Sequence, residues 1–183
     1  MKKILISMLC LLVSLISFSQ EKHLIEGNIN IINQSGNNTK TITGYGLTAG
    51  YYYKTKLGYI GLSTTYEFSD ISTINKSIYL KPTIMPCYTI TDRLRYTPKL
   101  YVAFGYGTTQ SDNYYIGIQR FLNYGAGINP FVFDFKIFKN LAVSFEFGQF
   151  GFTMIENTSN DNRVNLLEVN LFDNVKGGIR LIF

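Results

Sequence analysis

Apolar and polar side chains alternate along most of the chain, in blocks that polar segments separate. Successive side chains of a β-strand point to opposite faces, so this alternation predicts strands with one apolar face. After residue 20 no long apolar stripe at helical spacing occurs, and glycine recurs inside nearly every block. An irregularity near Gly148 predicts a β-bulge. The eight predicted strands span residues 23–33, 41–53, 57–68, 77–90, 98–108, 124–137, 141–155 and 164–183.

The connections between these predicted strands alternate in length. The short ones are residues 54–56, 91–97 and 138–140. The longer ones are rich in Asn, Ser and Thr, and their expected bounds are Gln34–Lys40, Asp70–Lys76, Thr109–Asn123 and Asn157–Arg163. An even number of strands, with short turns at one end and longer loops at the other, is typical of transmembrane β-barrels. The longest connection contains Tyr114, Tyr115 and Ile116, so we expect a hairpin to extend into it.

The two faces of the predicted strands differ in composition. One is apolar with few interruptions, whereas the other holds Gly, Ser, Thr and Ala with single charges. A soluble sandwich or a lipocalin turns its apolar face inward, and a membrane barrel turns it toward lipid. Alternation alone does not distinguish them, but small residues suit a narrow interior and aromatic residues gather toward strand ends as in interfacial girdles. The sequence therefore favours an all-β fold, an eight-stranded antiparallel up-and-down transmembrane β-barrel.

The first 19 residues have the organisation of a cleavable signal peptide. Lys2 and Lys3 precede an apolar stretch from Ile4 to Phe18, and small residues end it at Ser17 and Ser19. This stretch is shorter than the roughly 20 residues that cross a bilayer as a helix. We therefore predict a signal peptide over residues 1–19, export through the periplasm and a barrel domain over residues 20–183.

Composition narrows the chemistry that the chain can perform. The chain has 183 residues, of which 46% are hydrophobic and 16% charged, which excludes a disordered polyelectrolyte. With one His and two Cys, it has no multi-histidine metal site and no framework of disulfides. Its formal net charge of +5 is scattered along the chain, which does not indicate a nucleic-acid partner.

Candidate catalytic groups are few. His23, the only possible imidazole base, stands at the start of the first predicted strand without an obvious Ser partner. The Gly44-x-Gly46 and Gly105-x-Gly107 pairs lie inside strands, and no helix follows them to bind a phosphate. We expect no catalytic residue, no metal site and no cofactor.

Charged residues on the small-residue face are more informative. In a narrow lumen unpaired charges are costly, so we expect them to pair into a salt-bridged plug, with an ion path as the alternative. Glu146 and Arg180 are the first candidate pair, because they lie on neighbouring strands. The predicted lumen charges are Glu26, Glu67, Lys81, Asp134, Lys136, Glu146, Glu168, Lys176 and Arg180.

The C-terminal residues Val175–Phe183 have apolar residues or glycine at alternate positions and end on phenylalanine. Together with residues 129–148 and 97–107, they resemble strands of the small eight-stranded outer-membrane β-barrel family, the OmpA/OmpX-like barrels. This resemblance covers residues 20–183 and implies the outer membrane of a Gram-negative cell. It also implies two partners, outer-membrane lipid and the barrel-assembly machinery, with Phe183 as the assembly signal. Pro82 and Pro86 depart from the pattern, since a closed barrel has no edge for a missing N–H.

These features favour a non-enzymatic integral outer-membrane protein with a structural or surface-interaction role through its longer loops. The surface ligand is not evident from the sequence. A narrow porin-like channel for ions or small solutes is the alternative, and a secreted lipocalin-like binder is a weaker one.

Overall fold

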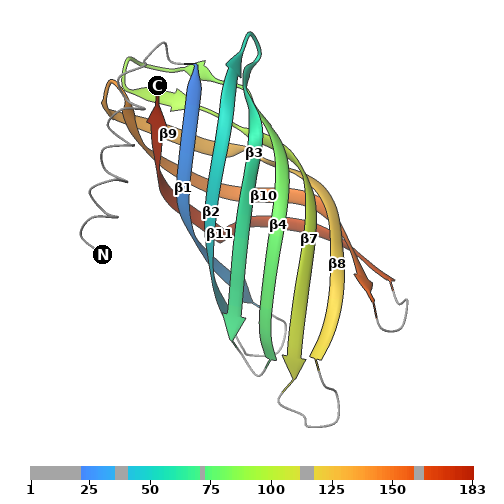
Figure 1. Ribbon diagram of the computed structural model, residues 1–183. Helices are drawn as coiled ribbons and strands as arrows, with labels where there is room; N and C mark the ends of the chain where they lie inside the picture. Colours follow the sequence, from blue (N-terminus) through green and yellow to red (C-terminus); the bar gives the residue numbers. More distant parts are fainter. Residues whose placement is uncertain (1–21, 36–40, 71–72, 112–117, 159–162) are drawn as a thin grey trace, which may run out of the picture.

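The computed structural model describes residues 22–35, 41–70, 73–111, 118–158 and 163–183, whose strands form one antiparallel sheet closed into a barrel (Figure 1). The predicted signal peptide and parts of the four longer connections lie outside the described residues. The strands are β1 (His23–Ser35), β2 (Thr41–Thr55), β3 (Gly58–Asp70), β4 (Thr73–Met85), β5 (Tyr88–Thr89), β6 (Leu94–Tyr96), β7 (Lys99–Ser111), β8 (Ile118–Asn129), β9 (Phe131–Phe138), β10 (Leu141–Asn157) and β11 (Arg163–Ile182).

The predicted ring of eight strands is confirmed, although three of its strands are interrupted. The breaks between β4 and β5, between β6 and β7, and between β8 and β9 contain Pro86, Pro98 and Pro130. Proline lacks the N–H that a ladder needs, so it interrupts the pairing where it occurs. Around the ring the order is β1, β2, β3, β4, β7, β8, β10 and β11, and β11 pairs with β1 to close it.

Pro82 lies inside β4, although a proline at this position argued against a strand. It stays in register with Leu62 of β3. On the other side, the pairing of β4 with β7 passes from Leu80 to Thr83 without it. At this gap the Lys81 carbonyl accepts hydrogen bonds from the side-chain hydroxyls of Thr83, at 2.9 Å, and Ser63, at 3.5 Å. Side-chain hydroxyls therefore satisfy the backbone where proline interrupts the ladder.

The predicted bulge is present in β10. Gly148 has a φ of +74°, which favours glycine, and the register with β11 shifts between Phe147 and Gln149. Before the bulge β10 pairs with β9, and after it β10 pairs with β8. The bulge thus lies where the pairing partner of β10 changes from β9 to β8.

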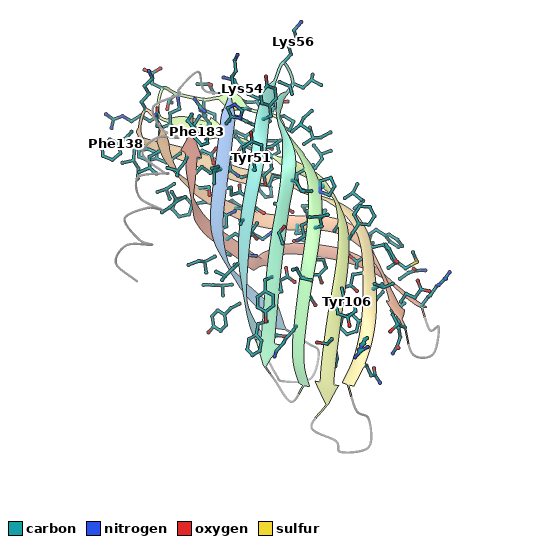
Figure 2. All side chains as sticks on the ribbon, viewed as in Figure 1. Tyr51, Lys54, Lys56, Tyr106, Phe138 and Phe183 are labelled. Carbon is teal, nitrogen blue, oxygen red and sulfur yellow. The ribbon has the colours of Figure 1, made fainter. Side chains whose placement is uncertain are left out.

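The wall of the barrel is apolar outside and polar inside. On β2, for example, Tyr45, Leu47 and Tyr51 are exposed, whereas Thr48 between them is buried. Figure 2 shows side chains projecting outward along the strands, with Tyr51 and Tyr106 toward opposite ends of the barrel. An exposed apolar band is the arrangement of a lipid-facing barrel, and a soluble barrel has the opposite one. Within the described residues, no helix is long and apolar enough to span a membrane.

The connections are distributed as predicted, but two are shorter than expected. The strand ends that the four longer connections join lie at one end of the barrel, and the short turns lie at the other end with the C-terminus (Figure 1). Strand β4 already begins at Thr73, and β7 and β8 extend to Ser111 and from Ile118. The hairpin therefore extends into Thr109–Asn123 as expected, although Tyr114, Tyr115 and Ile116 lie outside the described residues. The proposed loop Asp70–Lys76 is mostly strand. Polar residues at these positions continue the alternation of the strands. Composition alone therefore predicted longer loops than the structure has.

An apolar cluster fills the barrel at the end that holds the short turns. Its members come from five strands and are almost completely buried, and Cys87 packs against them as a free thiol. This cluster separates the polar lumen from that end of the barrel. It consists of Leu24, Tyr52, Tyr59, Met85 and Ile182.

Candidate functional site

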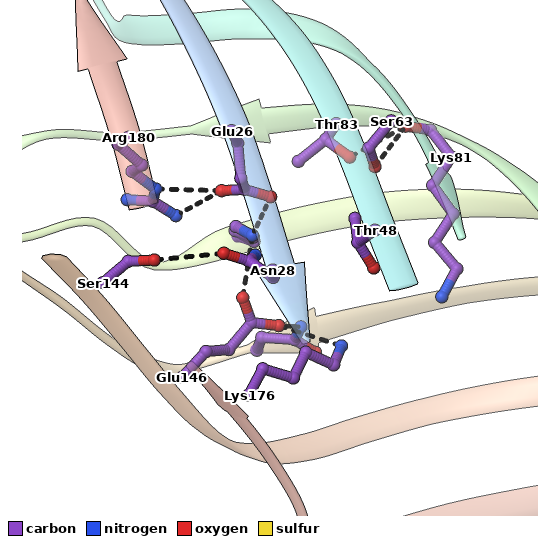
Figure 3. Close-up of polar contacts among 12 residues, drawn as sticks. Glu26, Asn28, Thr48, Ser63, Lys81, Thr83, Ser144, Glu146, Lys176 and Arg180 are labelled. Carbon is purple, nitrogen blue, oxygen red and sulfur yellow. Dashed lines mark hydrogen bonds and ion pairs between the residues drawn. The ribbon is translucent and has the colours of Figure 1, made fainter. Parts of the chain in front are cut away.

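The lumen contains an unbroken series of alternating charges, which we call the ion-pair chain. The side chains come from β9, β11, β1, β7 and β10, and none is more than 9% exposed. Figure 3 shows Glu26, Arg180, Glu146 and Lys176 of this chain in the barrel interior. The contacts are Asp134–Arg180 at 2.5 Å, Arg180–Glu26 at 2.7 Å, Glu26–Lys99 at 2.8 Å, Lys99–Glu146 at 2.7 Å and Glu146–Lys176 at 3.0 Å.

Neutral donors complete the environment of these buried charges. The Tyr52 hydroxyl donates to Glu26 at 3.3 Å, and the Asn129 amide donates to Glu146. Arg180 also donates to the Thr97 hydroxyl at 2.8 Å. Three carboxylates and three cations cancel within the chain, and buried charges are tolerated only when paired and hydrogen-bonded in this way. The arrangement therefore cross-links the interior of the barrel.

Glycines on the inner face provide the room for this packing. A Cβ on Gly61 would overlap the ring and backbone of Tyr52. A Cβ on Gly178 would overlap the side chain of Asn28, whose oxygen accepts a hydrogen bond from Ser144 at 3.1 Å. The small residues that the sequence places opposite the apolar face are thus needed where large polar side chains cross the lumen.

The structure brings five of the nine predicted lumen charges into the ion-pair chain: Glu26, Asp134, Glu146, Lys176 and Arg180. Glu67 and Lys136 are half-buried and lie outside the chain. The side chain of Glu168 lies outside those that the structure describes. Lys81 also points into the lumen (Figure 3), where its ammonium lies over the rings of Tyr79, at 4.9 Å, and Tyr101, at 5.5 Å.

The predicted direct pair between Glu146 and Arg180 is wrong. In the register of β10 with β11, Ala142 is opposite Arg180, and Glu146 is opposite Lys176. Three successive contacts, through Glu26 and Lys99, connect Arg180 to Glu146. Neighbouring strands alone do not define a pair, because the register decides which residues meet.

Lys99 occupies the middle of the ion-pair chain and was not predicted. It bridges Glu26 and Glu146, and its side chain is 8% exposed. The signal was present in the sequence, since Lys99 shares a strand face with Ala103 and Gly105. It lies directly after Pro98, at the start of β7.

A small polar cavity lies beside the ion-pair chain. Its volume is about 20 Å³, which is room for about one water molecule. Hydroxyl groups line part of it, and Thr48 accepts a hydrogen bond from Asn30 at 3.2 Å and contacts Thr65 at 3.0 Å. The lining residues are Asn28, Thr48, Ser63, Thr65, Lys81, Thr83, Lys99, Tyr101, Asn129, Glu146 and Lys176.

The two termini of the barrel meet at His23 and Phe183. The His23 N–H donates to the Phe183 carbonyl at 2.7 Å, and the Phe183 N–H donates to the His23 carbonyl at 2.9 Å. Their rings stack with centroids 5.8 Å apart, and His23 Nδ1 is 2.6 Å from the Tyr51 hydroxyl. Alternation with Ile179 and Leu181 would place Phe183 on the outward face of β11, but the residue is covered, with 7% of it exposed.

Comparison with known proteins identifies the architecture. No protein-family model and no curated protein sequence matches the chain. The structure is similar to the crystal structure of Neisserial surface protein A, with a TM-score of 0.56 and 10% identity, over 88% of this chain and 97% of that one. The chain has the fold of a small outer-membrane β-barrel. The family resemblance inferred from the sequence is thus confirmed as a resemblance of fold, and the outer-membrane location agrees with the apolar band.

Two other solved structures are similar to this barrel at lower TM-scores. A de novo designed transmembrane β-barrel has a TM-score of 0.45 and 13% identity, over 90% of this chain and 98% of that one. The attachment invasion locus protein Ail of Yersinia pestis has a TM-score of 0.41 and 14% identity, over 90% of this chain and 100% of that one.

Proposed function

We propose that the protein is a closed, non-enzymatic outer-membrane barrel that anchors its extracellular connections at the cell surface for a structural or surface-interaction role. The ion-pair chain carries this proposal, because it engages buried charges of five strands with one another. Mutual engagement of these groups supports a structural role for the lumen.

Two alternatives are less well supported by the geometry. A narrow channel needs a continuous aqueous path, but eight strands enclose little more than the space that side chains fill. The lumen cavity holds about one water molecule, and the apolar cluster lies at one end of the barrel. A lipocalin-like binder needs an apolar binding cavity inside the barrel. In this barrel the interior is polar and the outer wall is apolar.

We expect the purified, folded barrel to give no reproducible conductance steps in planar bilayers, because the ion-pair chain bridges opposite parts of the wall. A general porin reconstituted in the same bilayers is the positive control. Gel mobility before and after heating verifies that the inserted protein is folded. Reproducible unitary conductance from a heat-modifiable preparation would support the channel instead.

The orientation of the barrel can be tested by epitope insertion. A tag after Asn37 or Asn160, in connections at the long-loop end, is expected to be labelled on intact cells. A matched tag after Lys139, in the turn between β9 and β10, should be labelled only after the outer membrane is disrupted. The reverse pattern of labelling would place the long connections in the periplasm and contradict the surface role.

A further inference from the structure

Lys81 is a lumen cation that the ion-pair chain does not neutralise. Among the described residues, no carboxylate oxygen lies within the 4 Å limit of an ion pair with its ammonium. The ammonium is instead held over the faces of Tyr79 and Tyr101. The three carboxylates and three cations of the chain already cancel, so Lys81 is a positive charge outside that balance, and Glu67 is a negative one. Around the cavity itself, three lysines face one carboxylate, that of Glu146.

Three lysines line the same cavity, Lys81, Lys99 and Lys176. Each ammonium has three N–H donors. Lys99 directs one donor to Glu26 and one to Glu146, and Lys176 directs one to Glu146. Among the contacts of the described residues, one donor therefore remains on Lys99, two on Lys176 and three on Lys81.

Several acceptors around the cavity are already engaged, whereas the Asn129 side-chain oxygen is buried without a partner among the described residues. Glu146 receives Lys99, Lys176 and the Asn129 amide, so both of its oxygens are occupied. The Asn28 side-chain oxygen receives Ser144. Ser63 and Thr83 direct their hydroxyl hydrogens to the Lys81 carbonyl. The cavity thus combines an excess of N–H donors with an excess of positive charge.

We propose that this cavity binds one small inorganic monovalent anion, of the size class of chloride, between the ammonium groups of Lys81, Lys99 and Lys176. A water molecule is a poorer match, because it accepts hydrogen bonds but adds two O–H donors where donors are already in excess. The volume of about 20 Å³ suits a monatomic ion. The bound anion would neutralise Lys81 and tie β4 to β7 and β11.

The test compares the thermal unfolding of the folded barrel in sodium chloride with that in sodium gluconate, at equal ionic strength. A ligand that binds only the folded state raises the unfolding temperature with its concentration. We expect a rise of about 3 °C or more for each tenfold increase in chloride above the dissociation constant. Bromide should act like chloride, and crystals grown in bromide should show an anomalous peak between the three ammonium groups.

The variant Lys81→Met should lose this dependence on chloride while remaining heat-modifiable. Lys56→Met is the matched control, because it removes the same charge at the exposed turn between β2 and β3 (Figure 2) and should keep the dependence. Equal unfolding temperatures of the wild type in chloride and gluconate, or a bromide-grown crystal with only water at this position, would overturn the proposal. A dependence retained by Lys81→Met would also overturn it, by placing the effect elsewhere.

Discussion

Replacing Arg180 by methionine is expected to destabilise the folded barrel by about 3–5 kcal/mol, which is the usual cost of removing one partner from a buried ion pair. Arg180 contacts both Glu26 and Asp134, and all three side chains are at most 2% exposed. Its removal takes one cation from Asp134 and one from Glu26, which keeps its contact with Lys99. Methionine fills similar space, so the loss is electrostatic rather than a loss of packing.

The measurement is reversible urea unfolding of the barrel in lipid vesicles, followed by circular dichroism and by the heat-dependent shift on gels. Arg163→Met is the matched control, because Arg163 also pairs with a carboxylate, Glu156, at 3.0 Å. That pair is exposed, with 64% of the Arg163 side chain accessible, so its loss should cost less than about 1 kcal/mol. Equal destabilisation by the two variants would show that the ion-pair chain does not stabilise the lumen.

Double-mutant cycles distinguish residues that are in direct contact from residues that interact only through other members of the ion-pair chain. The pair Glu26→Gln and Arg180→Met should show a coupling energy of more than about 1 kcal/mol, as expected for residues in contact. The pair Glu146→Gln and Arg180→Met should show a clearly smaller coupling, because Glu26 and Lys99 stand between them. A larger coupling in the second cycle would contradict the order of contacts.

The sequence predicted the strands well because the period of alternation is a local property. Ile29 and Ile31 face outward and Asn28 and Asn30 inward, as the alternation requires, and no distant contact is needed to see it. The bulge at Gly148 was visible for the same reason. Lipid solvation explains why the apolar face is outside, and the combination of small inner residues with aromatic strand ends indicated it in advance.

The partners inside the lumen could not be predicted to the same extent. Contacts across the barrel depend on register, and register depends on bulges and on proline breaks that a single sequence does not position accurately. The meeting of Glu26 with Lys99, from non-neighbouring strands, follows only from closure of the ring. The role of Lys99 and the pairing of Glu146 with two lysines therefore required the three-dimensional structure.

Deleting Phe183 is expected to reduce the yield of barrel inserted into the outer membrane several-fold. The resemblance to small outer-membrane barrels implies that the assembly machinery recognises the last strand and its terminal aromatic residue. The structure adds that Phe183 closes the ring, through two backbone hydrogen bonds to His23 and a stacked ring. The deletion leaves the lumen charges and the long connections unchanged. Inserted and periplasmic protein should be quantified by fractionation and heat-modifiable mobility.

The control for this deletion has to be chosen from the structure. Ile182→Ala looks suitable on the alternation, because the side chain faces away from that of Phe183. However, Ile182 is 1% exposed and belongs to the apolar cluster, so its truncation should cost stability by itself. Phe138→Ala is a better control, since this exposed aromatic residue lies in the same end of the barrel and ends β9 (Figure 2). It should insert at the wild-type yield.

A second variant distinguishes recognition from packing. His23→Ala removes the ring that stacks on Phe183 but keeps the backbone hydrogen bonds and the C-terminal phenylalanine. If Phe183 acts as a recognition element, His23→Ala should insert normally and unfold at a slightly lower urea concentration, while the deletion fails at insertion. If both variants lose yield equally, closure of the ring is the limiting step. Wild-type yield for the Phe183 deletion would show that the terminal aromatic residue is dispensable, and its role as an assembly signal would be wrong.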